Sequence, residues 1–288
     1  MPHATAAPES TIESIMNHHY EPPPGGKVTI PYINSAGSKR IKHTPQRVRI
    51  TDLRTTDNHF TIDEMDFMGT KRESFADEAT IKDVIFKEAQ ELIKNTTGAT
   101  NVYAMSHLLR KDPALSVLDI PDDVPDEAEY RSSNVPAMQC RYSHGTPHTI
   151  PEAEHVRSKA ANCRWGVINV WKPLKTVTRQ PLAVCDATTV PESDLVGFPL
   201  RARPDVSPEK KERDVEIWHV MANPEHKWYW PSAMEPDEAL LIKCFDSKLD
   251  GRAGWAPHSV FNLPNDQGAP RESIEIRCVV LWEDQPKE

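Results

Sequence analysis

The sequence predicts a mainly β protein built as a sandwich or barrel, and three observations indicate this fold class. The second half of the chain contains short runs of β-branched and aromatic residues, about one every ten to fifteen residues, bounded by Pro, Asp, Asn or Gly. The 288 residues include 26 Pro but only 11 Gly, which favours rigid connections between strands over a helical bundle. The clearest helical periodicity is found near residues 79–94, before the strand-rich half.

The expected elements follow in chain order. Strands are predicted first at residues 27–33 and 47–53, where apolar positions alternate. The helix comes next, because apolar residues recur at helical spacing and NTTG supplies a stop; these residues are Ile81, Val84, Ile85, Ala89, Leu92 and Ile93. A strand is then predicted at residues 100–110. The strands of the second half are predicted at residues 164–174, 181–190, 215–222, 226–233, 238–247, 258–264 and 273–283.

The chain is expected to form one domain with an N-terminal arm. Residues 1–26 are polar and end in EPPPGG, so we expect a flexible or draped arm there and a single domain over residues 27–288. Residues 111–136 are acidic and rich in Pro. They are expected to form a loop or lid, and a disordered linker is the alternative.

Composition excludes several classes of protein. The net charge of -9 argues against a nucleic-acid partner, because phosphate binding needs a concentrated basic face. No apolar span of about 20 residues is present, and the N-terminus lacks the pattern of a secretory signal, so we expect no membrane association and a cytoplasmic location. The five cysteines are spread out without a CxxC pair, which is typical of reduced thiols; they are Cys140, Cys163, Cys185, Cys244 and Cys278.

The segment RYSHGTPHTIPEAEHVR, residues 141–157, contains three histidines in a Pro-broken loop before a predicted strand. Histidines in such a place often bind a metal ion. The usual carboxylate two residues after the first histidine is missing, because Thr146 follows His144 and Gly145. The segment therefore suggests either a metal site that has lost a ligand or no metal site.

Other polar residues interrupt apolar strands. Asn169 lies inside INVW, where a buried amide must be hydrogen-bonded; it could orient a ligand or satisfy a backbone group. His226 lies among aromatic residues that could form the core or the wall of a pocket. Arg277 lies within an apolar strand, which indicates either a structural ion pair or an anion-binding contact. His258 precedes another short strand.

Four blocks in this order, INVWKPL, PLAVCDATTV, HKWYWPSAMEPDEALLIKCFDS and PRESIEIR, closely resemble a fungal and bacterial hydroxylase/desaturase family, also called AsaB-like or gibberellin-desaturase-like. The resemblance covers about residues 27–284. It implies a double-stranded β-helix, a jelly-roll barrel, with flanking helices. It also implies an oxidoreductase that uses Fe(II) and 2-oxoglutarate, a non-heme iron dioxygenase acting on a small natural product in secondary metabolite biosynthesis.

The resemblance implies positions for the iron ligands, which in this family are two histidines and a carboxylate on one face of the metal. His144 matches the first histidine, Thr146 falls at the carboxylate position, and His226 matches the distal histidine. A carboxylate of 2-oxoglutarate would be bound by Arg271 or Arg277, because a strand arginine near the barrel mouth is a natural carboxylate clamp. Lys243 is the reserve candidate for this clamp.

The missing carboxylate leaves several functions open. Iron could bind through two histidines with water or an anion in the vacant position, or His148 could complete a three-histidine site. Without metal, the barrel could catalyse isomerisation, cyclisation or dehydration, with His144 or His226 as acid or base and Tyr229 or Tyr142 as proton donor. A non-catalytic partner subunit of an active paralogue is a further alternative, so a homodimer and a paralogue heterodimer both stay open.

Overall fold

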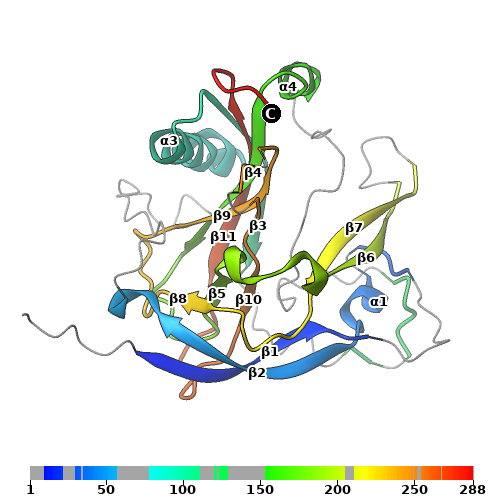
Figure 1. Cartoon of the computed structure of the whole chain (residues 1–288). Helices are drawn as coiled ribbons and strands as arrows, with labels where there is room; N and C mark the ends of the chain where they lie inside the picture. Colours follow the sequence, from blue (N-terminus) through cyan, green and yellow to red (C-terminus); the bar gives the residue numbers. More distant parts are fainter. Residues whose placement is uncertain are drawn as a thin grey trace, which may run out of the picture.

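The structure is a computed structural model of the chain. It describes residues 10–21, 30–33, 35–56, 78–110, 120–121, 123–128, 153–204, 211–248, 250–251, 254–266 and 268–287. Most strands belong to a four-stranded sheet and a five-stranded sheet, and a two-stranded hairpin lies beside them (Figure 1). Side chains from both larger sheets meet in a shared apolar cluster that contains Trp171 of one sheet and Leu182 of the other. This arrangement confirms the expected double-stranded β-helix.

The four-stranded sheet has the order β3-β11-β4-β9, and all its neighbouring strands are antiparallel. Its strands are β3 (Asn101–Arg110), β11 (Ser273–Trp282), β4 (Arg164–Pro173) and β9 (Leu240–Asp246). Side chains alternate between the two faces of a strand. On β11, Ile274, Ile276 and Cys278 therefore point to one face, and Glu275 and Arg277 point to the other.

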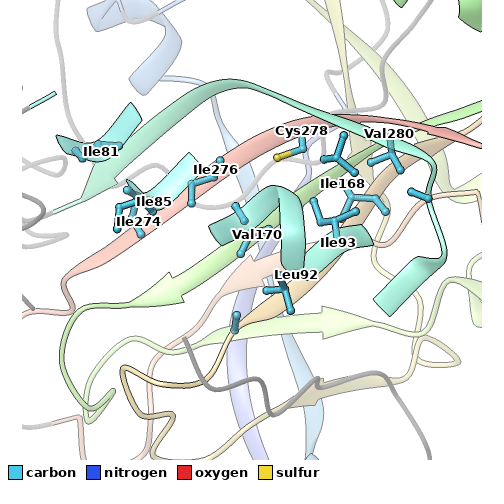
Figure 2. Packing of buried hydrophobic residues seen from close by; sticks show 14 of the residues in the cluster. Ile81, Ile85, Leu92, Ile93, Ile168, Val170, Ile274, Ile276, Cys278 and Val280 are labelled. Atoms are coloured by element: carbon cyan, nitrogen blue, oxygen red, sulfur yellow. The ribbon is translucent and has the colours of Figure 1, made fainter. Parts of the chain in front are cut away.

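A helical segment covers the outer face of this sheet. It consists of α2 (Glu78–Thr80), the π-helical turn η3 (Ile81–Ile85) and α3 (Phe86–Thr97), and it ends at Gly98, whose φ is 67°. Leu92 and Ile93 pack against strand residues such as Ile168 and Ile276, as Figure 2 shows. The helix predicted over residues 79–94 is thus confirmed, and it extends to Thr97.

The five-stranded sheet has the order β1-β2-β8-β5-β10, with β2 and β8 parallel and the other pairs antiparallel. Its strands are β1 (Thr11–His19), β2 (His43–Asp52), β8 (Trp228–Trp230), β5 (Leu182–Cys185) and β10 (His258–Val260). The hairpin consists of β6 (Leu195–Ala202) and β7 (Arg213–Val220). The short helices are α1 (Ala36–Lys39) and α4 (Ala153–Ala160), and the 3-10 turns are η1 (Leu53–Thr55), η5 (Ala187–Thr189) and η6 (Glu192–Asp194).

Alternation along β5 and β8 separates the two faces of the five-stranded sheet. Ala183, Cys185, Trp228 and Trp230 point outward into a cluster that also receives residues from β1 and the hairpin. Leu182 points inward and contacts the cluster shared with the four-stranded sheet. The inner face of the five-stranded sheet therefore packs against the inner face of the four-stranded sheet. Its outer face is covered by residues of β1 and the hairpin.

The structure differs from the sequence-based expectation near the N-terminus. Thr11–His19 forms β1, paired along its whole length with β2, whereas the sequence predicts no strand in the flexible or draped arm expected over residues 1–26. The pairing is favoured because Met16 is buried in the outer cluster. Of the strand expected at residues 27–33, the described part contains only an isolated bridge between Tyr32 and Arg201. Strand β6 had not been predicted.

Part of the acidic segment, residues 123–128, is bound to the α1 region. Arg40 donates hydrogen bonds to the carbonyl oxygens of Val124 and Pro121 at 2.8 and 2.7 Å and forms an ion pair with Asp126 at 2.6 Å. These contacts hold this part of the segment against the α1 region. Most of its other residues lie outside the described structure. Within the described ranges, no helix is long and apolar enough to cross a membrane.

Candidate active site

A layer of polar side chains lies on the inner face of the four-stranded sheet, between two apolar clusters. On β4 and β11, Val167 and Val279 belong to one cluster, and Trp171 belongs to the other. Asn169 lies on β4 between Val167 and Trp171 and pairs with Arg277 of β11. Trp171 pairs with Glu275. We call Asn169, Arg271, Ser273, Glu275 and Arg277 the inner polar layer. A polar layer at such a depth is costly unless its groups are satisfied or bind a ligand.

Arg271 is the most deeply buried cation of this layer. Its side chain lies over the Trp171 ring, with Cζ 5.4 Å from the ring centroid, and the residue is 9% exposed. Burial, and to a smaller extent the neighbouring Arg110, lower its pKa to about 9, and Glu275 opposes the change. The Nη1 atom is buried and has no hydrogen-bond partner in the described structure. A buried guanidinium with a donor directed at no acceptor is a candidate anion-binding group.

Glu275 is the carboxylate at the centre of the inner polar layer. Its Oε1 accepts a hydrogen bond from Asn169 Nδ2 at 2.7 Å and lies 3.8 Å from Arg277 Nη2. Glu275 also acts to raise the pKa of Arg110 and of His258 against the stronger effect of burial. One carboxylate therefore lies among three guanidinium groups and one imidazole. This arrangement favours binding of a small anion.

His258 faces the inner polar layer from the opposite sheet. It pairs with Val184, which pairs with Tyr229, so the three residues form one row across β10, β5 and β8. Its Nδ1 lies 3.1 Å from the Ala256 carbonyl oxygen. A carbonyl oxygen only accepts, so Nδ1 carries the proton and Nε2 presents a lone pair. Burial lowers the pKa of His258, which keeps the ring neutral at pH 7.

His226, the distal ligand expected from the sequence, lies elsewhere. Its Nε2 is 2.9 Å from Asp194 Oδ2, and Asn223 donates to the same oxygen at 2.7 Å. Asp194 ends η6, and the neighbouring Trp228 belongs to the outer cluster. Burial lowers the pKa of His226. His226 therefore lies on the outer side of the five-stranded sheet, and the structure does not bring it together with the strand arginines.

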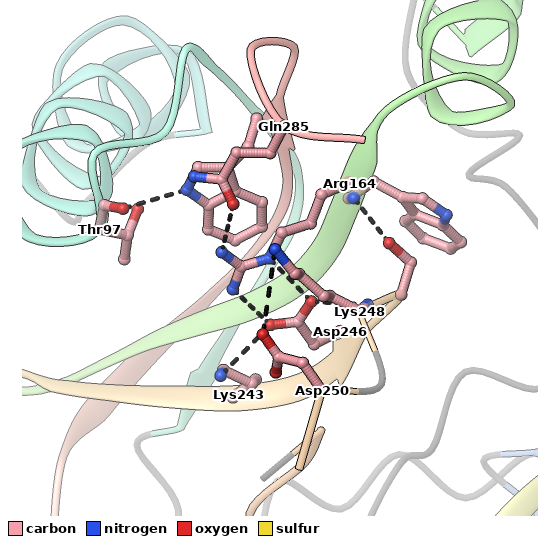
Figure 3. A network of polar contacts seen from close by, with 10 residues as sticks. Thr97, Arg164, Lys243, Asp246, Lys248, Asp250 and Gln285 are labelled. Atoms are coloured by element: carbon pink, nitrogen blue, oxygen red, sulfur yellow. Dashed lines mark hydrogen bonds and ion pairs between the residues drawn. The ribbon is translucent and has the colours of Figure 1, made fainter. Parts of the chain in front are cut away.

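Lys243, the reserve clamp, also lies apart from the inner polar layer. It pairs across the strands with Ile168, which points to the helix-covered face. Its Nζ is 3.4 Å from Asp246, in the network drawn in Figure 3. There Arg164 donates two hydrogen bonds to Asp246, at 3.0 and 2.6 Å, and stacks on Trp282. Lys243 thus contributes to an ion-pair network at the start of β4 and the end of β9.

The other sequence-predicted residues divide into two groups. Tyr229 of β8 and Arg277 of β11 face the barrel interior, and Arg271, two residues before β11, lies over Trp171. Tyr142, His144 and Thr146 lie outside the described residues, so their part in a metal site stays a prediction. Over the described ranges, no group of three His, Cys, Asp or Glu residues is already arranged to bind a metal ion.

His258 was missed as a candidate because the aromatic residues around His226 carried the stronger sequence signal. The signal for His258 was the alternation of β10, in which His258 and Val260 share one face and Ser259 takes the other. Val260 packs onto the cluster between the sheets, so His258 points the same way.

Comparison with known proteins agrees with this architecture. A family profile described as an Oxidoreductase/YMDC permease-like domain matches residues 17–281. Hydroxylase/desaturase efuI from Hormonema carpetanum is 41% identical over 300 residues, covering 99% of this chain and 100% of that protein. The chain belongs to the hydroxylase/desaturase family. It is an oxidoreductase family, and the resemblance inferred from the four sequence blocks is confirmed.

Other members of the group extend the comparison. Alpha-ketoglutarate-dependent dioxygenase phiK, from a fungal species, is 31% identical over 298 residues, covering 98% of this chain and 100% of that protein. Among solved structures, the iron and alpha-ketoglutarate-dependent endoperoxidase NvfI matches with a TM-score of 0.69 and 23% identity, over 96% of this chain and 99% of that one. At this identity the second comparison supports the fold alone.

Proposed function

We propose that this hydroxylase/desaturase family member is an Fe(II)- and 2-oxoglutarate-dependent oxygenase that acts on a small specialised metabolite between the two sheets. The observation that carries the proposal is the chemistry of two residues of the barrel interior, Arg271 and His258. One presents a buried donor for an anion, and the other presents a neutral nitrogen lone pair from the facing sheet. The names of related proteins, such as the alpha-ketoglutarate-dependent dioxygenase phiK, support the same cofactors.

The donor set fits these groups. His258 Nε2 would be one iron ligand, because iron binds neutral imidazole and the Ala256 carbonyl fixes the tautomer. His144 would be a second ligand by resemblance, with Thr146 at the position of the family's carboxylate. Arg271 would bind a carboxylate of 2-oxoglutarate. Iron with bound 2-oxoglutarate would activate dioxygen, the oxidant needed to remove hydrogen from an unactivated carbon.

The chain's own residues would bind and orient the reactants. The guanidinium of Arg271 lies over the Trp171 ring, with Cζ 5.4 Å from the ring centroid, which would help to position it before the co-substrate binds. Glu275 would keep the other arginines in place, and Tyr229 would face the substrate from the row that contains His258. Apolar clusters flank the inner polar layer on two sides.

One observation favours a second candidate function. The neutral His258 could also act as a general base, and by resemblance Thr146 stands at the position of the carboxylate that binds iron in the family. Non-oxidative isomerisation, cyclisation or dehydration is therefore the alternative, and a non-catalytic partner subunit is the third. In the alternative, turnover would persist under chelator and without oxygen.

Binding of Fe(II) and 2-oxoglutarate under anaerobic conditions tests the proposal. The wild-type chain should develop the visible absorption that accompanies chelation of Fe(II) by 2-oxoglutarate. His258→Ala should abolish it, and Arg271→Met should weaken 2-oxoglutarate binding by about ten- to a hundredfold, the value of a charged hydrogen bond. His155→Ala, at an exposed position, is the matched control. Full binding by both site variants would overturn the proposal.

A further inference from the structure

The orientation of the Asn169 side chain is fixed by its neighbour. Its Nδ2 donates to Glu275 Oε1 at 2.7 Å. A carboxylate accepts hydrogen bonds and does not donate them, so the reversed amide would place two acceptors against each other. The amide oxygen, Oδ1, must therefore point away from Glu275. The sequence alone had left open whether Asn169 satisfies a backbone group, and its amide nitrogen binds a side chain instead.

The Oδ1 atom of Asn169 is a buried acceptor. The residue is 2% exposed, and Oδ1 has no hydrogen-bond partner in the described structure. It lies in the inner polar layer, where Asn169 is flanked along β4 by Val167 and Trp171 on the same face. Buried carbonyl groups are almost always paired, with a protein group, an ordered water molecule or a ligand. The missing partner must be a hydrogen-bond donor.

The chemistry of the two proposed ligands decides which of them can supply this donor. At neutral pH 2-oxoglutarate offers two carboxylates and a ketone, all of which only accept hydrogen bonds. It can therefore bind Arg271 Nη1, a donor, but it cannot satisfy Asn169 Oδ1. Asn169 and Trp171 lie two residues apart on one strand, so their Cα atoms are about 7 Å apart and their side chains share one face.

We propose that Asn169 is a specificity-determining residue that accepts a hydrogen bond from a hydroxyl group of the organic substrate, with Glu275 as the positioning residue that sets its amide. The site would thus select an alcohol over the corresponding ketone. This inference deepens the proposed function and rests on it only for the assignment of Arg271 to the co-substrate. A site built around a buried acceptor rejects analogues that lack the donor.

The test uses two fragments of equal size, cyclohexanol and cyclohexanone, which differ in whether the oxygen can donate. Their affinities are measured by ligand-observed NMR titration of the full chain, without metal and again with Fe(II) and 2-oxoglutarate. The wild type should bind cyclohexanol about tenfold more tightly than cyclohexanone, because one buried hydrogen bond contributes about that factor. Asn169→Leu should bring the ratio of the two affinities, cyclohexanol to cyclohexanone, close to one. Asn162→Leu, at an exposed position, should leave this ratio unchanged.

A second variant keeps the test decisive if Asn169→Leu does not fold. Glu275→Gln has nearly the same volume, but its amide can both donate and accept, so Asn169 is free to turn. The preference for the alcohol should then fall toward one, mainly because cyclohexanone binds better. Rescue of ketone binding is a result that a purely structural role of Glu275 would not produce.

Three results would overturn the inference: no binding of either fragment, a wild-type ratio near one, or a preference that survives in both variants. A wild-type ratio near one would mean that water satisfies Asn169. Failure of the proposed function is distinguishable, because it would appear as absent 2-oxoglutarate binding while the alcohol preference persists. Conversely, 2-oxoglutarate binding that weakens in Asn169→Leu as much as in Arg271→Met would assign Asn169 to the co-substrate and refute its role in substrate selection.

Discussion

Replacing His219 by Phe should protect the fold against acid. His219 lies on β7, is 4% exposed, and stacks on Phe198 with the ring centroids 4.7 Å apart. Its Nδ1 is 3.2 Å from the Nδ1 of His19, and the His43 ring lies 5.9 Å away. Burial, followed by these two histidines, lowers the pKa of His219 from 6.5 to about 3. The hairpin is thus attached to β1 and β2 through imidazoles that must stay neutral.

The sign and size of the effect follow from this pKa. Because the folded-state pKa is lower than the unfolded value, the unfolded chain binds the proton first as the pH falls. His219 therefore imposes no penalty above pH 6.5, and stability is lost progressively between about pH 6.5 and pH 3. One pKa unit corresponds to about 1.4 kcal/mol, so the loss at pH 5 is about 2 kcal/mol. Burial also lowers the pKa of His19 and His43, so these residues further reduce the free energy of unfolding as the pH falls.

Urea unfolding at pH 7.5 and pH 5 measures this loss directly. Phe keeps the ring stack with Phe198 and cannot bind a proton, so His219→Phe should lose about 2 kcal/mol less than the wild type between the two pH values. The exposed His155, changed to Gln, should show the wild-type pH dependence. Equal losses for the wild type and His219→Phe would refute the reasoning.

Three further predictions concern the ion pair, the outer histidine and the missing carboxylate. Asp246→Asn should lower the free energy of unfolding by about 3–5 kcal/mol, because it leaves Arg164 buried without its bidentate partner; a loss under 1 kcal/mol by urea unfolding would contradict this. His226→Ala should lower the melting temperature yet retain Fe(II) binding, unlike His258→Ala; equal metal loss in both variants would restore His226 as a ligand. Thr146→Asp should raise Fe(II) affinity measured by metal titration, since an anionic ligand adds Coulomb attraction, and unchanged affinity would argue against a lost carboxylate.

The elements with strong periodicity could be predicted from the sequence. The helix that ends at Thr97 has apolar residues on one face, and β11 carries an apolar residue at nearly every outward position. Strand β1 is not predicted because two of the four residues on its packed face are polar, Ser14 and His18, which weakens the alternation. Ser14 is nevertheless satisfied, since it donates to the Asn262 carbonyl at 2.7 Å. Such a long-range partner cannot be inferred from local pattern.

The candidate site was predicted in part. The sequence indicates Arg271 as a cation at the start of a strand, and the structure places it over Trp171 in the interior; its role in binding a co-substrate stays a prediction. The choice between His226 and His258 depended on which face of a sheet each occupies, and this requires the pairing of strands far apart in the chain. The role of Asn169 likewise depends on Glu275, which is 106 residues away in sequence.

The position of β1 matters for how the protein is produced. A recombinant chain that starts at residue 27, the boundary suggested by composition, would lack an entire edge of the five-stranded sheet. Met16, which is 1% exposed, would be missing from the outer cluster, and β2 would present an unpaired edge along which chains can aggregate. The same holds for a gene annotation that places the start codon too far downstream. Affinity tags are therefore better joined before residue 10 than substituted for the N-terminal segment.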